Sequence, residues 1–219
     1  MIYALLGCLV VIIAGFFLVP RVIRLRKQKR REELAAQPFP ENWRELLRQR
    51  FPLYKQLPVQ LQSRLEGFIH IFLDEKVFLG RGGMTINDEV RLLISAQACL
   101  LILNKATDFY PGFRTILVYP DVYQAQALQN QHGVVSQHQQ LRAGESWHRG
   151  PVVVAWSSVV EGAEDPEDGA NVVFHEFSHK LDEEDSVMDG TPVLETRQQY
   201  SEWVRAFSTE YEQLVEQVA

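Results

Sequence analysis

The sequence predicts an α+β fold with several helices, a small sheet and one transmembrane helix ahead of the folded body. Three observations carry this prediction. Residues 2–19 contain no charged side chain, and residues 59–103 place apolar side chains at helical spacing. Residues 115–119 and 152–156 are short runs rich in β-branched and aromatic residues. With 219 residues, 46% of them hydrophobic, the chain is long enough for one main domain with a well-formed core.

Charge is distributed unevenly along the chain, although the net charge is only -6. Residues 21–31 carry seven basic side chains and no acidic one, whereas residues 151–219 carry three basic and sixteen acidic side chains. Proteins that bind nucleic acids neutralise phosphates with clustered Lys and Arg. The acidic second half therefore argues against direct nucleic-acid binding.

The first twenty residues have the pattern of a transmembrane helix. The eighteen residues from Ile2 to Val19, at 1.5 Å each, give about 27 Å, close to the roughly 30 Å hydrocarbon core of a bilayer. By the positive-inside rule, the basic cluster that follows places the amino terminus outside and the body in the cytoplasm. A cleaved signal peptide and a buried core helix are the alternatives, and the order of charges favours a span over both.

These observations divide the chain into three parts. We expect a transmembrane helix at residues 1–20, a basic juxtamembrane linker at residues 21–37 and a folded domain at residues 38–219. The predicted location is a membrane, crossed once, with the domain facing the cytoplasm.

Helices dominate the first half of the predicted domain. Residues 41–50 have helical character and end before Pro52. Residues 59–78 follow the three-and-four spacing of an amphipathic helix, which the glycines at 80, 82 and 83 terminate. Thr85 and Asp88 suggest the start of a second, strongly apolar helix that runs to about Leu103 and forms central core.

The second half changes to short strands and ends in helices. The runs 115–119 and 152–156 predict strands of a small sheet. Residues 161–169 form a turn-rich acidic connection into a helix that carries two histidines, and a further helix begins at about Arg197.

The run His175-Glu176-Phe177-Ser178-His179 has the spacing of a metal site on a helix. His175 and His179 are one turn apart on the same face, so both imidazoles can reach one Zn²⁺ at about 2.0 to 2.1 Å. Glu176 lies about 100° round the helix, which suits a general base for an attacking water molecule. The pattern predicts a zinc hydrolase, and the alternative is a surface helix with two solvated histidines.

Other candidate groups have weaker patterns. Asp182 and Asp189 could act as local third ligands, although the pattern favours support of an imidazole or a neighbouring backbone group for Asp182 and a turn for Asp189. The four remaining histidines have no partner at ligand spacing and are assigned no role: His70, His132, His138 and His148. Cys8 and Cys99 have neither disulfide-framework nor metal-site spacing.

Several segments in the same order resemble the Mlc titration factor A family of zinc peptidases. They are Pro40–Leu47, Leu65–Gly67, Phe72–Leu73, Gly82–Gly83, Ala96–Leu101, Tyr110–Gly112, Leu117–Pro120 and Asp165–Asp182. The resemblance covers about residue 38 to the carboxyl end. It implies a zincin-like α+β metallopeptidase fold, His175 and His179 as zinc ligands, Glu176 as the base, and binding of the glucose repressor Mlc.

The chain departs from that family in two respects. The resemblance implies a third zinc ligand from a Glu roughly sixty residues past the first histidine, as in gluzincins, whereas this chain stops forty residues after His179. We therefore expect that the domain lacks its C-terminal part and that the third ligand lies beyond Ala219. The transmembrane segment is the second departure.

Two functions follow as expectations. The first is a membrane-tethered zinc peptidase, aminopeptidase-like, that hydrolyses peptide bonds. The alternative is a membrane-tethered regulatory protein that sequesters a transcriptional repressor with little or no hydrolysis. For the peptidase, the run 151–156 is expected to form a sheet edge to which an extended peptide adds, although a core strand paired on both edges is an open alternative.

Overall fold

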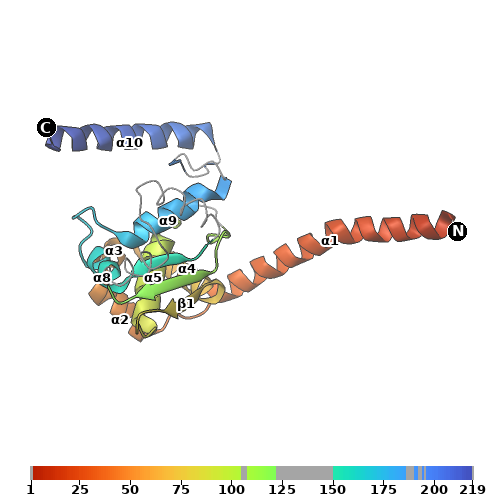
Figure 1. Ribbon diagram of the computed structural model, residues 1–219, viewed down its shortest axis with the longest axis horizontal. Helices are drawn as coiled ribbons and strands as arrows, with labels where there is room; N and C mark the ends of the chain where they lie inside the picture. Colours follow the sequence, from red (N-terminus) through yellow and green to blue (C-terminus); the bar gives the residue numbers. More distant parts are fainter. Residues whose placement is uncertain are drawn as a thin grey trace, which may run out of the picture.

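The computed structural model describes residues 2–104, 108–121, 150–185, 190–191, 194 and 196–218. In chain order its elements are α1 (Ile2–Ala35), α2 (Glu41–Arg50), α3 (Pro52–Gln56), α4 (Val59–Glu75), β1 (Val77–Gly80), α5 (Asp88–Leu101), β2 (Thr115–Tyr119), β3 (Val152–Ala155), α8 (Trp156–Glu164), α9 (Val172–Asp182), η1 (Glu183–Asp185) and α10 (Arg197–Val218). Figure 1 shows α2 to α9 gathered in one body, with the start of α1 extending away and α10 lying beyond α9.

The sheet consists of three parallel strands in the order β1-β2-β3. Parallel neighbours need a crossover connection, and α5 lies in the connection between β1 and β2. One face of the sheet is buried through Phe78, Ile116, Val118, Val152 and Val154. The helical body therefore covers that face.

Helix α5 is the centre of the core, as its apolar sequence predicts. Its residues from Leu92 to Cys99 are all buried, and the helix packs against α4, α8 and α9. The helix is capped by Asn87 rather than through the Thr85 and Asp88 pattern that the sequence suggested. The Asn87 side-chain oxygen accepts a hydrogen bond from the Val90 N–H at 2.9 Å. The helix with the two histidines, α9, packs directly against α5.

Helix and strand boundaries agree with the sequence in most places. The predicted helix at 41–50 and the strand at 115–119 are confirmed. The predicted helix at 59–78 ends at Glu75 instead, because Val77–Gly80 pairs with β2 as β1. Gly80 permits the close turn that follows β1, since a Cβ there would lie 1.9 Å from the Met84 carbonyl oxygen. Helix α8 also takes up the start of the predicted acidic turn.

The predicted fold class, α+β with a preceding transmembrane helix, is wrong. The chain is mostly helical, with one small parallel sheet. Among the helices that the structure describes, none has a stretch both long enough and apolar enough to cross a bilayer. The predicted single-pass membrane location, with the domain facing the cytoplasm, is wrong for the same reason.

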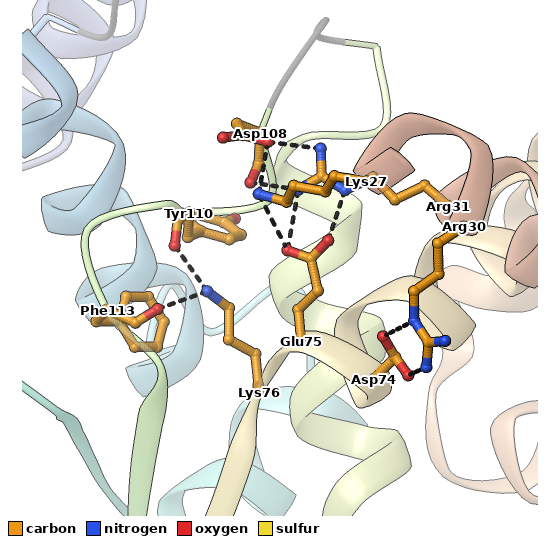
Figure 2. Close-up of polar contacts among 9 residues, drawn as sticks. All are labelled: Lys27, Arg30, Arg31, Asp74, Glu75, Lys76, Asp108, Tyr110 and Phe113. Carbon is orange, nitrogen blue, oxygen red and sulfur yellow. Dashed lines mark hydrogen bonds and ion pairs between the residues drawn. The ribbon is translucent and has the colours of Figure 1, made fainter. Parts of the chain in front are cut away.

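Three members of the basic cluster that suggested a membrane edge, Lys27, Arg30 and Arg31, instead pair with acidic residues of the body. Residues 21–35 continue α1 without a break, and the end of this helix packs on α4. Arg30 forms a two-point ion pair with Asp74, with its Nε 2.9 Å from the carboxylate, and lowers the pKa of that carboxyl. Figure 2 shows this pair beside the ion pair of Arg31 with Glu75, at 2.5 and 2.9 Å. These pairs explain the positive charges of Arg30 and Arg31, because guanidinium groups bind carboxylates in fixed two-bond geometry.

A buried lysine fixes the segment that leads into β2. The Lys76 ammonium donates to the carbonyl oxygens of Tyr110 at 2.6 Å and Phe113 at 2.8 Å (Figure 2). Burial lowers the pKa of Lys76 to about 8. Tyr110 also has a positive φ of 55°, which costs free energy unless surrounding contacts hold it. Its hydroxyl donates to the Ala98 carbonyl at 2.6 Å, so the segment is held from two sides.

Candidate metal centre

Helix α9 has one buried face and one exposed face. Val173, Phe177 and Leu181 are buried at four-residue spacing and face the core. His175 and His179 are both exposed, and Glu176 is half-buried. The apolar stripe therefore determines which face of the helix presents the two histidines.

An aromatic cluster holds the buried face in place. The Phe177 ring lies 5.0 Å from that of Tyr110, 5.6 Å from Phe113 and 5.8 Å from Phe72, measured between centroids. Such edge-to-face and tilted arrangements are favourable beyond the area that they bury. Because Phe177 lies between the two histidines in sequence, this packing fixes the rotation of the helix about its axis.

The two imidazoles lie side by side on the exposed face. Their ring centroids are 4.7 Å apart and the ring planes are nearly perpendicular, at 84°. Side chains four residues apart on a helix are expected to lie this close together. The arrangement brings two imidazole rings to one surface of the helix.

The donor set fits two ligands of a zinc site. Imidazole nitrogen is an ordinary zinc ligand, and such sites need at least three protein ligands. In the parts of the chain that the structure describes, no cluster of three or more His, Cys, Asp or Glu side chains is arranged to hold a metal ion. Asp182 accepts a hydrogen bond from the Gly190 N–H at 2.9 Å, as a turn-forming carboxylate does. Asp189 lies outside the described residues.

The other histidines are not part of the pair on α9. His70 is half-buried against the rings of Phe39 and Trp43, and burial lowers its pKa. It is therefore a packing residue, consistent with the absence of an assigned role. His132, His138 and His148 lie outside the described residues.

An open pocket of about 350 Å³ lies beside His175. Its walls come from the loop that precedes α9, including Asp165 and Asp168, and from Phe174, His175 and Ser178 of the helix. A space of this size can admit part of a substrate next to the imidazole.

Main-chain hydrogen bonds show which groups of β3 face away from the sheet. The Arg81 N–H donates to the Val118 carbonyl at 2.9 Å, so Val118 points toward β1. In a parallel ladder, successive residues point to opposite neighbours, so Leu117 points toward β3. Its register partner Val153 then directs its N–H and C=O away from β2. No strand of the described chain lies beyond β3.

Sequence reasoning missed the residues that begin the histidine helix. Asn171 is the N-cap of α9, and it also binds Gln97 of α5 and the Gly162 carbonyl of α8. Two local signals were available: an asparagine directly before an apolar helical run, and a lone amide within the apolar helix α5. Neither signal indicates that the two residues, 74 positions apart, are in contact.

Comparisons with known proteins identify a family that this chain matches. The family model described as glucose-regulated metallo-peptidase M90 matches residues 25–219. A protein of Synechocystis, named only as uncharacterized protein slr2042, is 42% identical over 191 residues, which is 86% of this chain and 70% of that protein.

Relatives named Mlc titration factor A match a smaller region. The protein from an Escherichia coli strain is 30% identical over 141 residues, 64% of this chain and 52% of its own length. That of Salmonella agona is 28% identical over 132 residues, 60% of this chain and 49% of its own length. The matched region thus spans about half the length of these relatives. The resemblance to the Mlc titration factor A family is confirmed.

Proposed function

Because this chain belongs to the glucose-regulated metallopeptidase M90 family, we propose that it is a zinc-dependent peptidase. In this proposal His175 and His179 bind the metal and Glu176 is the general base. The observation that carries it is the pairing of two imidazoles, whose ring centroids are 4.7 Å apart on the exposed face of α9, with half-buried Glu176 next to His175 in the sequence. Two imidazole ligands on a helix suit zinc among the common metal ions.

The chain's own residues have distinct parts in hydrolysis. A zinc ion held by the two imidazoles would supply Lewis-acid activation of water and of the peptide carbonyl. The Glu176 carboxylate accepts a proton from the attacking water molecule as the water oxygen bonds to the carbonyl carbon. The protonated Glu176 then donates that proton to the leaving amine as the C–N bond breaks, and it returns to the ionised form.

The metal ligands are tested by removing each imidazole. His175→Ala and His179→Ala should each lower zinc affinity by more than the roughly 10–100-fold that changes to outer-shell residues cause. Zinc per chain after dialysis, and the visible spectrum of the cobalt-loaded protein, measure this. Ser178→Ala, an exposed neighbour on the same helix, is the matched control. Wild-type zinc content in both histidine variants would refute the assignment.

We propose that the substrate backbone binds along the edge of β3 that faces away from β2. An extended peptide adds to such an edge by main-chain hydrogen bonds, and α9 packs directly against β3. Val153 offers its N–H on the outer side, while the side chains of Val152 and Val154 are buried and hold the strand. The peptide carbonyl that is cleaved would then lie toward the histidines.

Val153→Pro should raise KM by about fivefold, because it removes one edge donor worth roughly 1 kcal/mol, without changing zinc affinity. Steady-state kinetics with a short peptide and a zinc titration provide the two measurements. Val153→Ala, which keeps the N–H, controls for the loss of the side chain. A parallel loss of zinc affinity, or failure to fold, would show that this edge is covered.

Repressor binding is a second candidate function. Relatives at 28–30% identity carry the name Mlc titration factor A, which suggests interaction with the Mlc repressor. Sequestration needs a surface but no hydrolysis, so a variant without turnover separates the two functions.

A further inference from the structure

Asn171 makes more hydrogen bonds than a helix cap requires. Its side-chain oxygen accepts from the Phe174 N–H at 2.8 Å, which is the capping bond. Its amide nitrogen donates in addition to the Gln97 side-chain oxygen at 2.8 Å and to the Gly162 carbonyl at 2.7 Å. A cap needs only the acceptor, so the two donor bonds call for another explanation.

Gln97 connects Asn171 to the core through further hydrogen bonds. It is fully buried in α5, and its amide nitrogen donates to the Leu93 carbonyl at 3.0 Å and the Val159 carbonyl at 3.3 Å. All four N–H donors of the two amides are therefore paired. Flipping either amide would set oxygen against a carbonyl oxygen, so both orientations are fixed.

The contact between α8 and α9 depends on a glycine. A Cβ on Gly162 would lie 2.9 Å from the Asn171 Cα and 3.0 Å from the Ala170 carbonyl oxygen. The absence of that atom lets the Gly162 carbonyl reach the Asn171 amide. Three helices thus meet at one pair of amides, of which Gln97 is buried and Asn171 half-buried.

We infer that Gln97 and Asn171 form an amide relay that positions the metal-binding face of α9. This inference rests on the proposed function. The His175 N–H donates to the Asn171 carbonyl at 2.9 Å, so His175 belongs to the first turn that the relay anchors. A shift at Asn171 moves His175 directly, and ligand geometry tolerates only about 0.5 Å. Asn171 and Gln97 are positioning residues that contact no substrate.

Asn171→Asp separates the relay from simple capping. Aspartate caps helices as well as asparagine does and favours the helix dipole, but it has no donor for Gln97 or Gly162. A pure cap therefore predicts unchanged metal affinity. The relay predicts that zinc and cobalt bind about tenfold more weakly or worse. The added negative charge would by itself attract a cation, so it cannot produce that loss.

Asn87→Asp is the matched control, because Asn87 caps α5 through the same type of bond at 2.9 Å. Asn87→Asp should leave metal affinity and the amide hydrogen exchange of α9 unchanged. Hydrogen exchange of residues 172–179 gives a second measurement that needs no metal, and it should speed up in Asn171→Asp alone. If that variant does not fold, Asn171→Ser retains a cap and should show the same selective losses.

Each result decides the question. Wild-type metal affinity and wild-type exchange in Asn171→Asp would overturn the relay, as would equal losses in Asn87→Asp. If the wild-type chain binds neither zinc nor cobalt, the proposed metal function fails, and exchange in α9 alone then decides whether the relay positions this helix.

Discussion

Replacing Glu176 with Gln is expected to lower kcat by about a hundredfold or more, since general acid–base catalysis contributes on that scale. Glutamine keeps the size of the side chain but cannot accept the proton from water. Glu176 is half-buried and follows the exposed His175 in the sequence, and within the described part of the chain no hydrogen bond joins it to either imidazole. The zinc content of the variant should therefore equal that of the wild type.

The measurement is single-turnover hydrolysis of a peptide with equal zinc loading in both proteins. Glu183→Gln is a suitable control, because Glu183 pairs with Lys180 at 3.0 Å just past the end of α9. Undiminished turnover in zinc-loaded Glu176→Gln would assign the base elsewhere. The same variant tests the second function: if it binds Mlc as the wild type does, repressor binding is independent of hydrolysis.

Local signals were enough to place the histidine helix. The apolar residues at 173, 177 and 181 and the one-turn spacing of the histidines are properties of a single helix, and the structure has them on opposite faces. The strand at 115–119 was equally local. The third ligand could not be located in this way, because metal ligands are brought together by tertiary structure rather than by spacing.

Long-range contacts explain what the sequence did not reveal. Arg30 and Arg31 resemble a membrane flank until their partners Asp74 and Glu75, each 44 positions away, are known. Strand β1 has only four residues and follows a helical pattern without a break, so only its pairing with β2 identifies it. In both cases a tertiary interaction decides between two structures that the local pattern allows.

Phe177→Ala is expected to destabilise the protein by about 3–5 kcal/mol, the usual cost of removing a buried phenylalanine ring. Phe177 is fully buried, and its ring contacts the rings of Phe72, Tyr110 and Phe113. The remaining cavity cannot close easily, because Lys76 holds the carbonyls of Tyr110 and Phe113 in place. Urea unfolding with and without zinc would measure the loss.

The same substitution at Phe207 provides the comparison. Phe207 lies on α10 and is 56% exposed, so Phe207→Ala should change stability by no more than about 0.5 kcal/mol. Because the buried ring fixes the rotation of α9, Phe177→Ala should also weaken zinc binding while the chain is still folded. If both substitutions changed the free energy of unfolding by equally small amounts, α9 would not be packed in the core as the structure has it. The positions of the two histidines would then not be fixed by that packing.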